Sequence, residues 1–135
     1  MTLFVDTSVW SLALRRDAMP KGSEVQRLRE ALGGGESIYT TGIVLQELLQ
    51  GFQGPRAKAQ IAERFGVIPM IAPGRDDYID AAKLRNECGR HGIQIGTIDA
   101  LLAQLCIRHK LVMLATDLDF SHMTKWTSLQ LWHVQ

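Results

Sequence analysis

The segment Thr2-Leu3-Phe4-Val5-Asp6-Thr7-Ser8 begins with an apolar run and ends in an acid followed by two hydroxyl side chains. Residues 2–5 are apolar or β-branched, which is typical of a short buried strand. Thr7 or Ser8 is suited to cap a helix that continues through Leu14. The segment therefore predicts a strand, an acid at its carboxyl end and a helix that starts there.

Similar strand and helix patterns alternate along the rest of the chain. Further strands are expected at 37–40, 67–71, 111–115 and 129–134. Helices are expected at about 23–32, 42–52, 56–65, 76–90 and 98–109, with Thr41 and Thr97 as caps and a turn or short helix at 117–122. Nearly all-apolar strands that alternate with helices indicate a parallel sheet buried on both faces. We therefore expect one α/β domain over residues 1–135.

The composition is that of an ordinary globular protein. Of 135 residues, 46% are hydrophobic and 21% are charged, which suits one domain with a real core. The two cysteines form no paired motif, which favours a reducing compartment. The N-terminal residues lack the pattern of a signal peptide, and no apolar run is long enough to span a bilayer. We expect a soluble, cytoplasmic protein with no membrane partner.

Five acids are expected at one edge of the sheet. Asp6 ends the first strand, and Asp117 and Asp119 directly follow the strand at 111–115. Glu47 and Asp99 lie near the starts of helices that return antiparallel to the sheet, so they begin at that same edge. Ligands of open parallel sheets bind outside the carboxyl ends of the strands. The sequence therefore predicts a site where these acids meet.

The acids lack obvious cationic partners in the sequence. Glu47 lies on the apolar face of its helix and Asp99 borders one, and no Lys or Arg stands at matching helical spacing. Buried carboxylates are costly unless they are paired or bind a cation, and hard divalent ions prefer carboxylate oxygens. Singly, Asp99 fits a first-turn helix residue, Asp117 a helix cap, and Glu47 a side chain that reaches solvent. Their convergence is what predicts Mg²⁺, or Mn²⁺, at this edge.

The charge balance favours a polyanionic substrate. The chain has 15 Lys and Arg and 14 Asp and Glu. With five acids at a metal site, nine acids remain, and the rest of the molecule carries a net charge of about +6. Candidate phosphate contacts are the basic residues near 15–16, 21, 56–58 and 85–90, each of which also fits a solvated helix face.

Four motifs in order resemble a known family. They are FVDTSVW at Phe4–Trp10, QELLQG at Gln46–Gly51, IGTIDALLA at Ile95–Ala103 and ATDLDF at Ala115–Phe120. Together they span nearly the whole chain, which resembles a PIN-domain ribonuclease, and specifically a VapC-type toxin of a type II toxin–antitoxin system. One departure is that Gln104 and Cys106 stand where small residues are expected.

The resemblance implies a three-layer α/β/α sandwich around a central, mostly parallel sheet. It implies Mg²⁺-dependent hydrolysis of RNA to 5′-phosphate and 3′-hydroxyl products, a homodimer and a cognate antitoxin protein. Its catalytic quartet carries over to Asp6, Glu47, Asp99 and Asp117, with Asp119 as a variable fifth metal ligand and Thr7, Ser8 and Thr116 as polar supports. We assign the principal metal to Asp6 and Asp99, and the water or a second metal to Glu47 and Asp117.

The sequence also offers alternatives to a magnesium-dependent ribonuclease. Zinc is an alternative because C-x-x-H occurs at Cys88/His91 and at Cys106/His109, but a dozen residues of intervening helix span roughly 18 Å. The Asp-x-Asp motif of haloacid dehalogenases, the receiver pattern and the glycine-rich nucleotide loops are missing from the sequence. A housekeeping RNA-processing nuclease of the same fold and a non-catalytic RNA-binding or partner-binding PIN-like module remain open.

Overall fold

The computed structural model describes residues 2–15 and 22–133, and its centre is a parallel sheet. The strands are β1 (Leu3–Val5), β2 (Ile38–Tyr39), β3 (Val112–Leu114) and β4 (Gln130–Leu131), in the order β2-β1-β3-β4. Every neighbouring pair is parallel, and Leu3 pairs with both Ile38 and Val112. The carboxyl ends of β1 and β3 therefore lie side by side.

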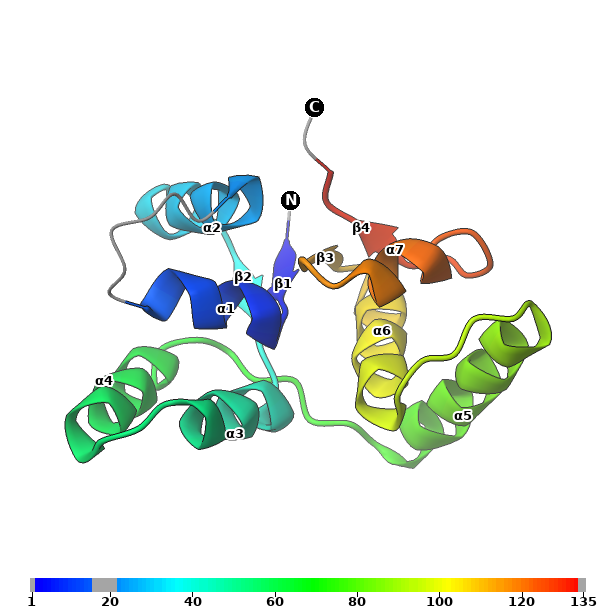
Figure 1. Ribbon diagram of the computed structural model, residues 1–135, viewed down its shortest axis with the longest axis horizontal. Coiled ribbons are helices and arrows are strands. Elements are labelled where there is room, and N and C mark those ends of the chain that lie inside the picture. Colours follow the sequence, from blue (N-terminus) through cyan, green and yellow to red (C-terminus); the bar gives the residue numbers. More distant parts are fainter. Residues whose placement is uncertain (1, 16–21, 134–135) are drawn as a thin grey trace.

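The sheet is covered by helices on both sides. The helices are α1 (Thr7–Leu14), α2 (Ser23–Gly33), α3 (Gly42–Gly51), α4 (Pro55–Phe65), α5 (Arg75–Arg90), α6 (Thr97–His109) and α7 (Leu118–Met123). They form two groups with the strands between them (Figure 1). All three side chains of β1 are fully buried, as a strand covered on both faces requires. The predicted three-layer α/β/α class is confirmed.

The strand predicted at 67–71 is wrong. This segment makes only an isolated parallel bridge, in which Met70 pairs with Thr40 beside β2. Pro69 has no N–H to donate, and Val67 is 86% exposed, so the apolar run meets the sheet at one position only. The last strand is also shorter than the predicted 129–134, and Val134 lies outside the described residues.

The capping residues of two helices differ from the prediction. Asp6 itself caps α1, because its extended backbone lets the carboxylate accept a hydrogen bond from the Ser8 N–H, so neither Thr7 nor Ser8 is the cap. Gly96 precedes α6, and Thr97 is its first helical residue. The Thr41 cap is confirmed, since its hydroxyl accepts from the Val44 N–H.

An ion pair joins the two longest helices. Asp77 of α5 is only 3% exposed and accepts hydrogen bonds from Nε and Nη2 of Arg108 in α6, at 2.6 and 2.9 Å. It also accepts from the Gly74 N–H. The Arg108 guanidinium holds the pKa of Asp77 below its usual value, since it favours the ionised carboxylate. The pair helps to fix α6, whose first turn carries Asp99.

None of the helices in the described part of the chain is long and apolar enough to cross a membrane.

Candidate active site

Asp6 is positioned by its place between β1 and α1. Its backbone N–H donates to Leu114 O of β3 at 2.9 Å, which holds it against the neighbouring strand. Its Oδ2 accepts from the Ser8 backbone at 3.1 Å and the Ser8 hydroxyl at 2.6 Å. The side chain is 6% exposed, and this burial raises the pKa of Asp6 despite the Ser8 hydrogen bonds.

Ser8 also ties β1 to the loop after β3. Its Oγ accepts a hydrogen bond from the Thr116 backbone N–H at 3.2 Å. The same hydroxyl donates to Asp6, so one side chain fixes the positions of two segments that are distant in sequence. Ser8 and Thr116 thus belong to one hydrogen-bonded chain with Asp6, although Thr116 contributes its backbone rather than its hydroxyl.

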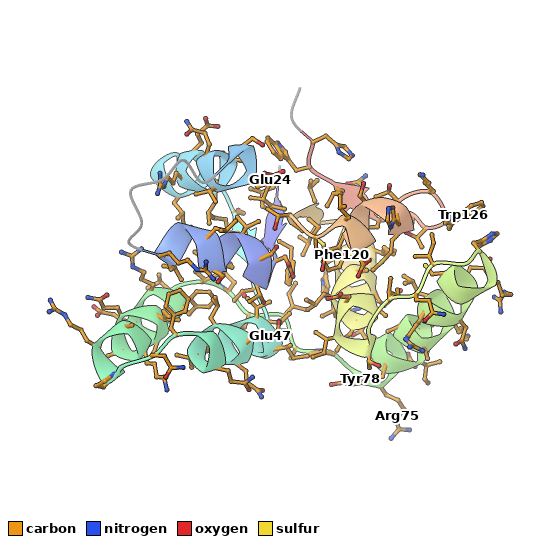
Figure 2. All side chains as sticks on the ribbon, in the orientation of Figure 1. Glu24, Glu47, Arg75, Tyr78, Phe120 and Trp126 are labelled. Carbon is orange, nitrogen blue, oxygen red and sulfur yellow. The ribbon has the colours of Figure 1, made fainter. Side chains whose placement is uncertain are left out.

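Glu47 reaches this edge from α3. Thr7 Oγ1, at the start of α1, donates to Glu47 Oε1 at 2.8 Å, and Figure 2 shows Glu47 beside that end of the helix. The Glu47 side chain is half-buried. The hydrogen bond occupies one carboxylate oxygen and leaves the other for a further partner.

Three more acids gather where α6 and α7 begin. Asp99, Asp117 and Asp119 each offer one carboxylate oxygen, and these three oxygens lie within 4.8 Å of one another. Asp117 caps α7 by accepting from the Asp119 N–H at 2.9 Å, which holds the two acids together. Fully buried Phe120 anchors the short helix that carries Asp119 (Figure 2).

The electrostatics of Asp99 link all five acids. Burial raises its pKa to about 6, and the negative charges of the other four acids add to this effect. In the described part of the chain, no Lys, Arg or His forms an ion pair with any of the five. The five predicted acids therefore form one electrostatic cluster without a counter-charge from residues 2–15 and 22–133.

The sequence also matches a family model over most of its length. Residues 3–125 match the model of the PIN domain. The chain belongs to the PIN domain family. No curated protein sequence gives a significant match.

Solved structures share this fold at low sequence identity. VapBC2 from Rickettsia felis, bound to a promoter DNA fragment, is 18% identical over 100% of both chains, with a TM-score of 0.77. VapBC-1 from nontypeable Haemophilus influenzae is 17% identical over 98% of this chain and 97% of that one, with a TM-score of 0.74. VapC20 from Mycobacterium tuberculosis, a sarcin–ricin loop cleaving toxin, is 20% identical over 94% and 98%, with a TM-score of 0.68.

The acidic edge of this PIN domain fits a hard divalent cation. Its donors are carboxylate oxygens from separate elements, which is the donor type that Mg²⁺ and Mn²⁺ prefer. Burial is the main cause of the raised pKa of Asp99, and repulsion by the other four carboxylates adds to it. Asp119, a variable fifth ligand by resemblance, belongs to the tight group with Asp99 and Asp117. Its signal in the sequence was its spacing of two from the capping Asp117.

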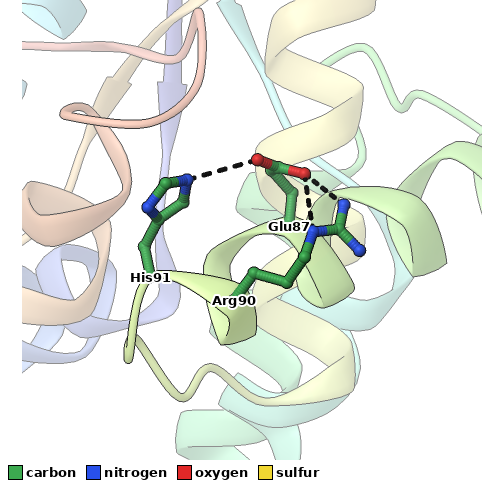
Figure 3. Close-up of polar contacts among 3 residues, drawn as sticks. All are labelled: Glu87, Arg90 and His91. Atoms are coloured by element: carbon green, nitrogen blue, oxygen red, sulfur yellow. Dashed lines mark hydrogen bonds and ion pairs between the residues drawn. The ribbon is translucent and has the colours of Figure 1, made fainter.

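The zinc alternative finds no support in the PIN domain. Both cysteines are buried, and burial raises the pKa of each thiol. His91 contacts the Glu87 carboxylate, which also binds Arg90 (Figure 3), and its ring stacks on Trp126 at 3.7 Å. Over residues 2–15 and 22–133, the only group of potential metal ligands is Asp99, Asp117 and Asp119.

Proposed function

We propose that this PIN domain is a Mg²⁺-dependent endoribonuclease and the toxin of a toxin–antitoxin pair. The observation that carries the proposal is the convergence of five acids at the carboxyl edge of the sheet without a protein cation. A cluster of this kind stabilises a divalent ion, and a nuclease needs such an ion because the phosphodiester and its leaving oxygen carry negative charge.

Each acid has a role in this proposal. Asp99 belongs to the tight group and to the electrostatic neighbourhood of Asp6, so we assign the ion to Asp99, Asp6, Asp117 and Asp119. When bound, the ion lowers the pKa of a coordinated water and stabilises negative charge on oxygen. Glu47, held through Oε1 by Thr7, keeps its other oxygen to orient the attacking water and accept its proton.

The proposed substrate is RNA. The remainder of the chain is basic once the five acids are set aside, which favours a polyanion. VapC20, a protein of the same fold, is a sarcin–ricin loop cleaving toxin, and two further structural neighbours are VapBC complexes. By analogy we assign this chain a structured cellular RNA in the cytoplasm, a cognate antitoxin and a homodimeric state.

The test compares cleavage of total cellular RNA by the parent and by Asp6→Asn, with Mg²⁺, with Mn²⁺ and with EDTA. We expect discrete cuts with 5′-phosphate ends from the parent alone, abolished by EDTA. Asp76→Asn is the matched control, because Asp76 is an exposed acid in the first turn of α5, away from the acidic edge. Folded, antitoxin-free parent that leaves every RNA intact under both metals contradicts the proposal and favours the non-catalytic module.

A housekeeping nuclease of the same fold would share all of these site residues. Expression in cells separates the two, because a toxin arrests growth and its Asp6→Asn variant does not. Coexpression with the product of an adjacent small gene restores growth only if that product is an antitoxin. Cleavage in vitro without growth arrest would favour the housekeeping enzyme.

A further inference from the structure

A groove of about 760 Å³ lies at the ends of α1 and α3 that face away from the acids. Both helices start at the acidic edge, where Thr7 donates to Glu47, and they pack against each other (Figure 1). Leu14, which lines the groove, is seven residues beyond Thr7, or roughly 10 Å along the helix axis. The groove and the acidic edge are thus at opposite ends of one short pair of helices.

The groove combines apolar and cationic side chains. Its lining includes Leu14 of α1, Phe52 after α3, and Arg56, Ile61 and Arg64 of α4. The two arginines of α4 are eight residues apart, about 12 Å along that helix. No acid is among the lining residues that the structure describes, and neither arginine pairs with a described acid. The described lining of the groove is therefore positively charged.

The helix dipoles do not reverse this charge. The negative C-terminal ends of α1 and α3 open toward the groove, but so does the positive N-terminal end of α4, where Gly54 to Ala57 line it. These partial charges oppose one another. The full charges of the lining arginines, Arg56 and Arg64 of α4 together with Arg15, consequently decide which ligands the groove attracts.

We propose that this groove, at the ends of α1 and α3 opposite the acidic edge, binds the phosphodiester backbone of single-stranded RNA. Guanidinium groups bind phosphate through paired hydrogen bonds, and Phe52 gives the groove an aromatic surface for a base. A cationic track with an aromatic surface is typical of proteins that hold single strands without reading their sequence. The inference rests on the proposed function, because the groove would hold the RNA flanking the cut.

The test measures binding separately from cleavage. A fluorescent, mixed-sequence 12-nucleotide RNA is titrated with Asp6→Asn protein in EDTA at several salt concentrations. The same protein carrying Arg56→Gln and Arg64→Gln is compared with one carrying Arg29→Gln and Arg75→Gln. Both control arginines are exposed and line none of the grooves described, and Arg75 extends away from the body of the protein (Figure 2).

We expect the RNA affinity of the groove variant to depend less steeply on salt than that of the control variant. Each phosphate contact on a single strand contributes about 0.7 to the slope of log Kd against log salt, so two lost contacts lower it by about 1.4. The ratio of the Kd of the groove variant to the Kd of the control variant then falls about seven-fold between about 50 and about 200 mM salt. Arg56→Lys with Arg64→Lys restores most of the slope, because the charges remain.

The outcomes distinguish this inference from the proposed function. Equal slopes for groove and control variants, with cleavage intact in the parent, overturn the groove assignment alone. A lowered slope in the groove variant, together with a parent that cuts no RNA, supports the groove and contradicts the nuclease. Tighter binding of poly-glutamate than of RNA, lost in the groove variant, overturns RNA as the occupant in favour of an acidic protein segment.

Discussion

The protein treats two of its acids, at opposite ends of α6, in opposite ways. Asp77 is neutralised within the fold by a two-point hydrogen bond from Arg108, and its pKa is lowered. Asp99 lies at the other end of α6, surrounded by four further acids, and its pKa is raised to about 6. The same residue type is thus neutralised within the fold in one place and, under the proposed function, by a bound cation in the other. The contrast separates an acid that is paired within the fold from the acids to which the proposed function assigns the metal.

Removing a charge from the acidic edge gives the largest expected effect. Asp99→Asn should lower RNA cleavage more than about 100-fold, since loss of a metal ligand exceeds the 10–100-fold cost of losing an outer partner. The metal-free protein should be stabilised by about 1 kcal/mol, a value reduced for solvent screening because Asp99 is only half-buried. Single-turnover cleavage and urea unfolding in EDTA measure the two effects.

Asp76→Asn is the control for this prediction, since it removes an exposed acid with no partner at the acidic edge. Cleavage by Asp99→Asn within ten-fold of the control would exclude Asp99 as a ligand. Destabilisation of the metal-free Asp99→Asn protein would show that the acidic edge is already satisfied without an ion.

The matching change in the ion pair should act in the opposite direction. Asp77→Asn is expected to lower the free energy of unfolding by about 2 kcal/mol, below the 3–5 kcal/mol of fully buried pairs because Arg108 is 46% exposed. Cleavage per folded molecule should remain near that of the parent. Urea unfolding of Asp77→Asn, Arg108→Gln and the double variant gives the coupling, and additive effects would contradict a direct interaction.

The support of Asp6 predicts a smaller loss. Ser8→Ala removes the hydroxyl that donates to Asp6 and accepts from the Thr116 N–H, so cleavage should fall about ten-fold. Ser11→Ala, on the same helix without a contact to the acids, should leave cleavage unchanged. The Mg²⁺ concentration for half-maximal cleavage should rise in Ser8→Ala only. An unchanged value would mean that Asp6 is held well enough by the α1 backbone.

The sequence predicted one half of this contrast better than the other. The acidic edge could be foreseen because the carboxyl ends of parallel strands must meet, which placed Asp6 near Asp117 whatever the details of packing. The Asp77–Arg108 pair could not, because it joins residues 31 apart on two helices whose crossing is set only by packing. The position of Asp119 in the cluster likewise depends on the local turn that caps α7, in which its N–H donates to Asp117.

Failure of the prediction at 67–71 has a related cause. The segment Val67-Ile68-Pro69-Met70-Ile71 is as apolar as the true strands, so hydrophobicity alone indicated a strand. It lies beyond the edge of the sheet, where only Ile71 is buried and one bridge forms. Apolar content alone therefore predicted neither the burial of this segment nor its pairing, because both depend on how the chain arrives from α4.

The pH dependence of the metal-free protein should show both acids at once. Asp99 has a folded pKa of about 6, above its ordinary 3.8, so the folded state binds more protons between these values and stability falls as pH rises through them. Asp77 has a lowered pKa, so its contribution is complete above its ordinary 3.8 and is lost as pH falls below that value.

Stability in EDTA should therefore be greatest near pH 4–5 and fall by about 1 kcal/mol toward pH 7. Unfolding by urea across this range should show a smaller fall in Asp99→Asn than in the parent, and the remainder is expected from Asp6, whose pKa burial also raises. Saturating Mg²⁺ should remove the fall, because the ion favours the ionised carboxylates that protonation otherwise replaces. A fall in Asp99→Asn as large as that in the parent would assign the pH dependence to other groups and weaken the contrast between the two ends of α6.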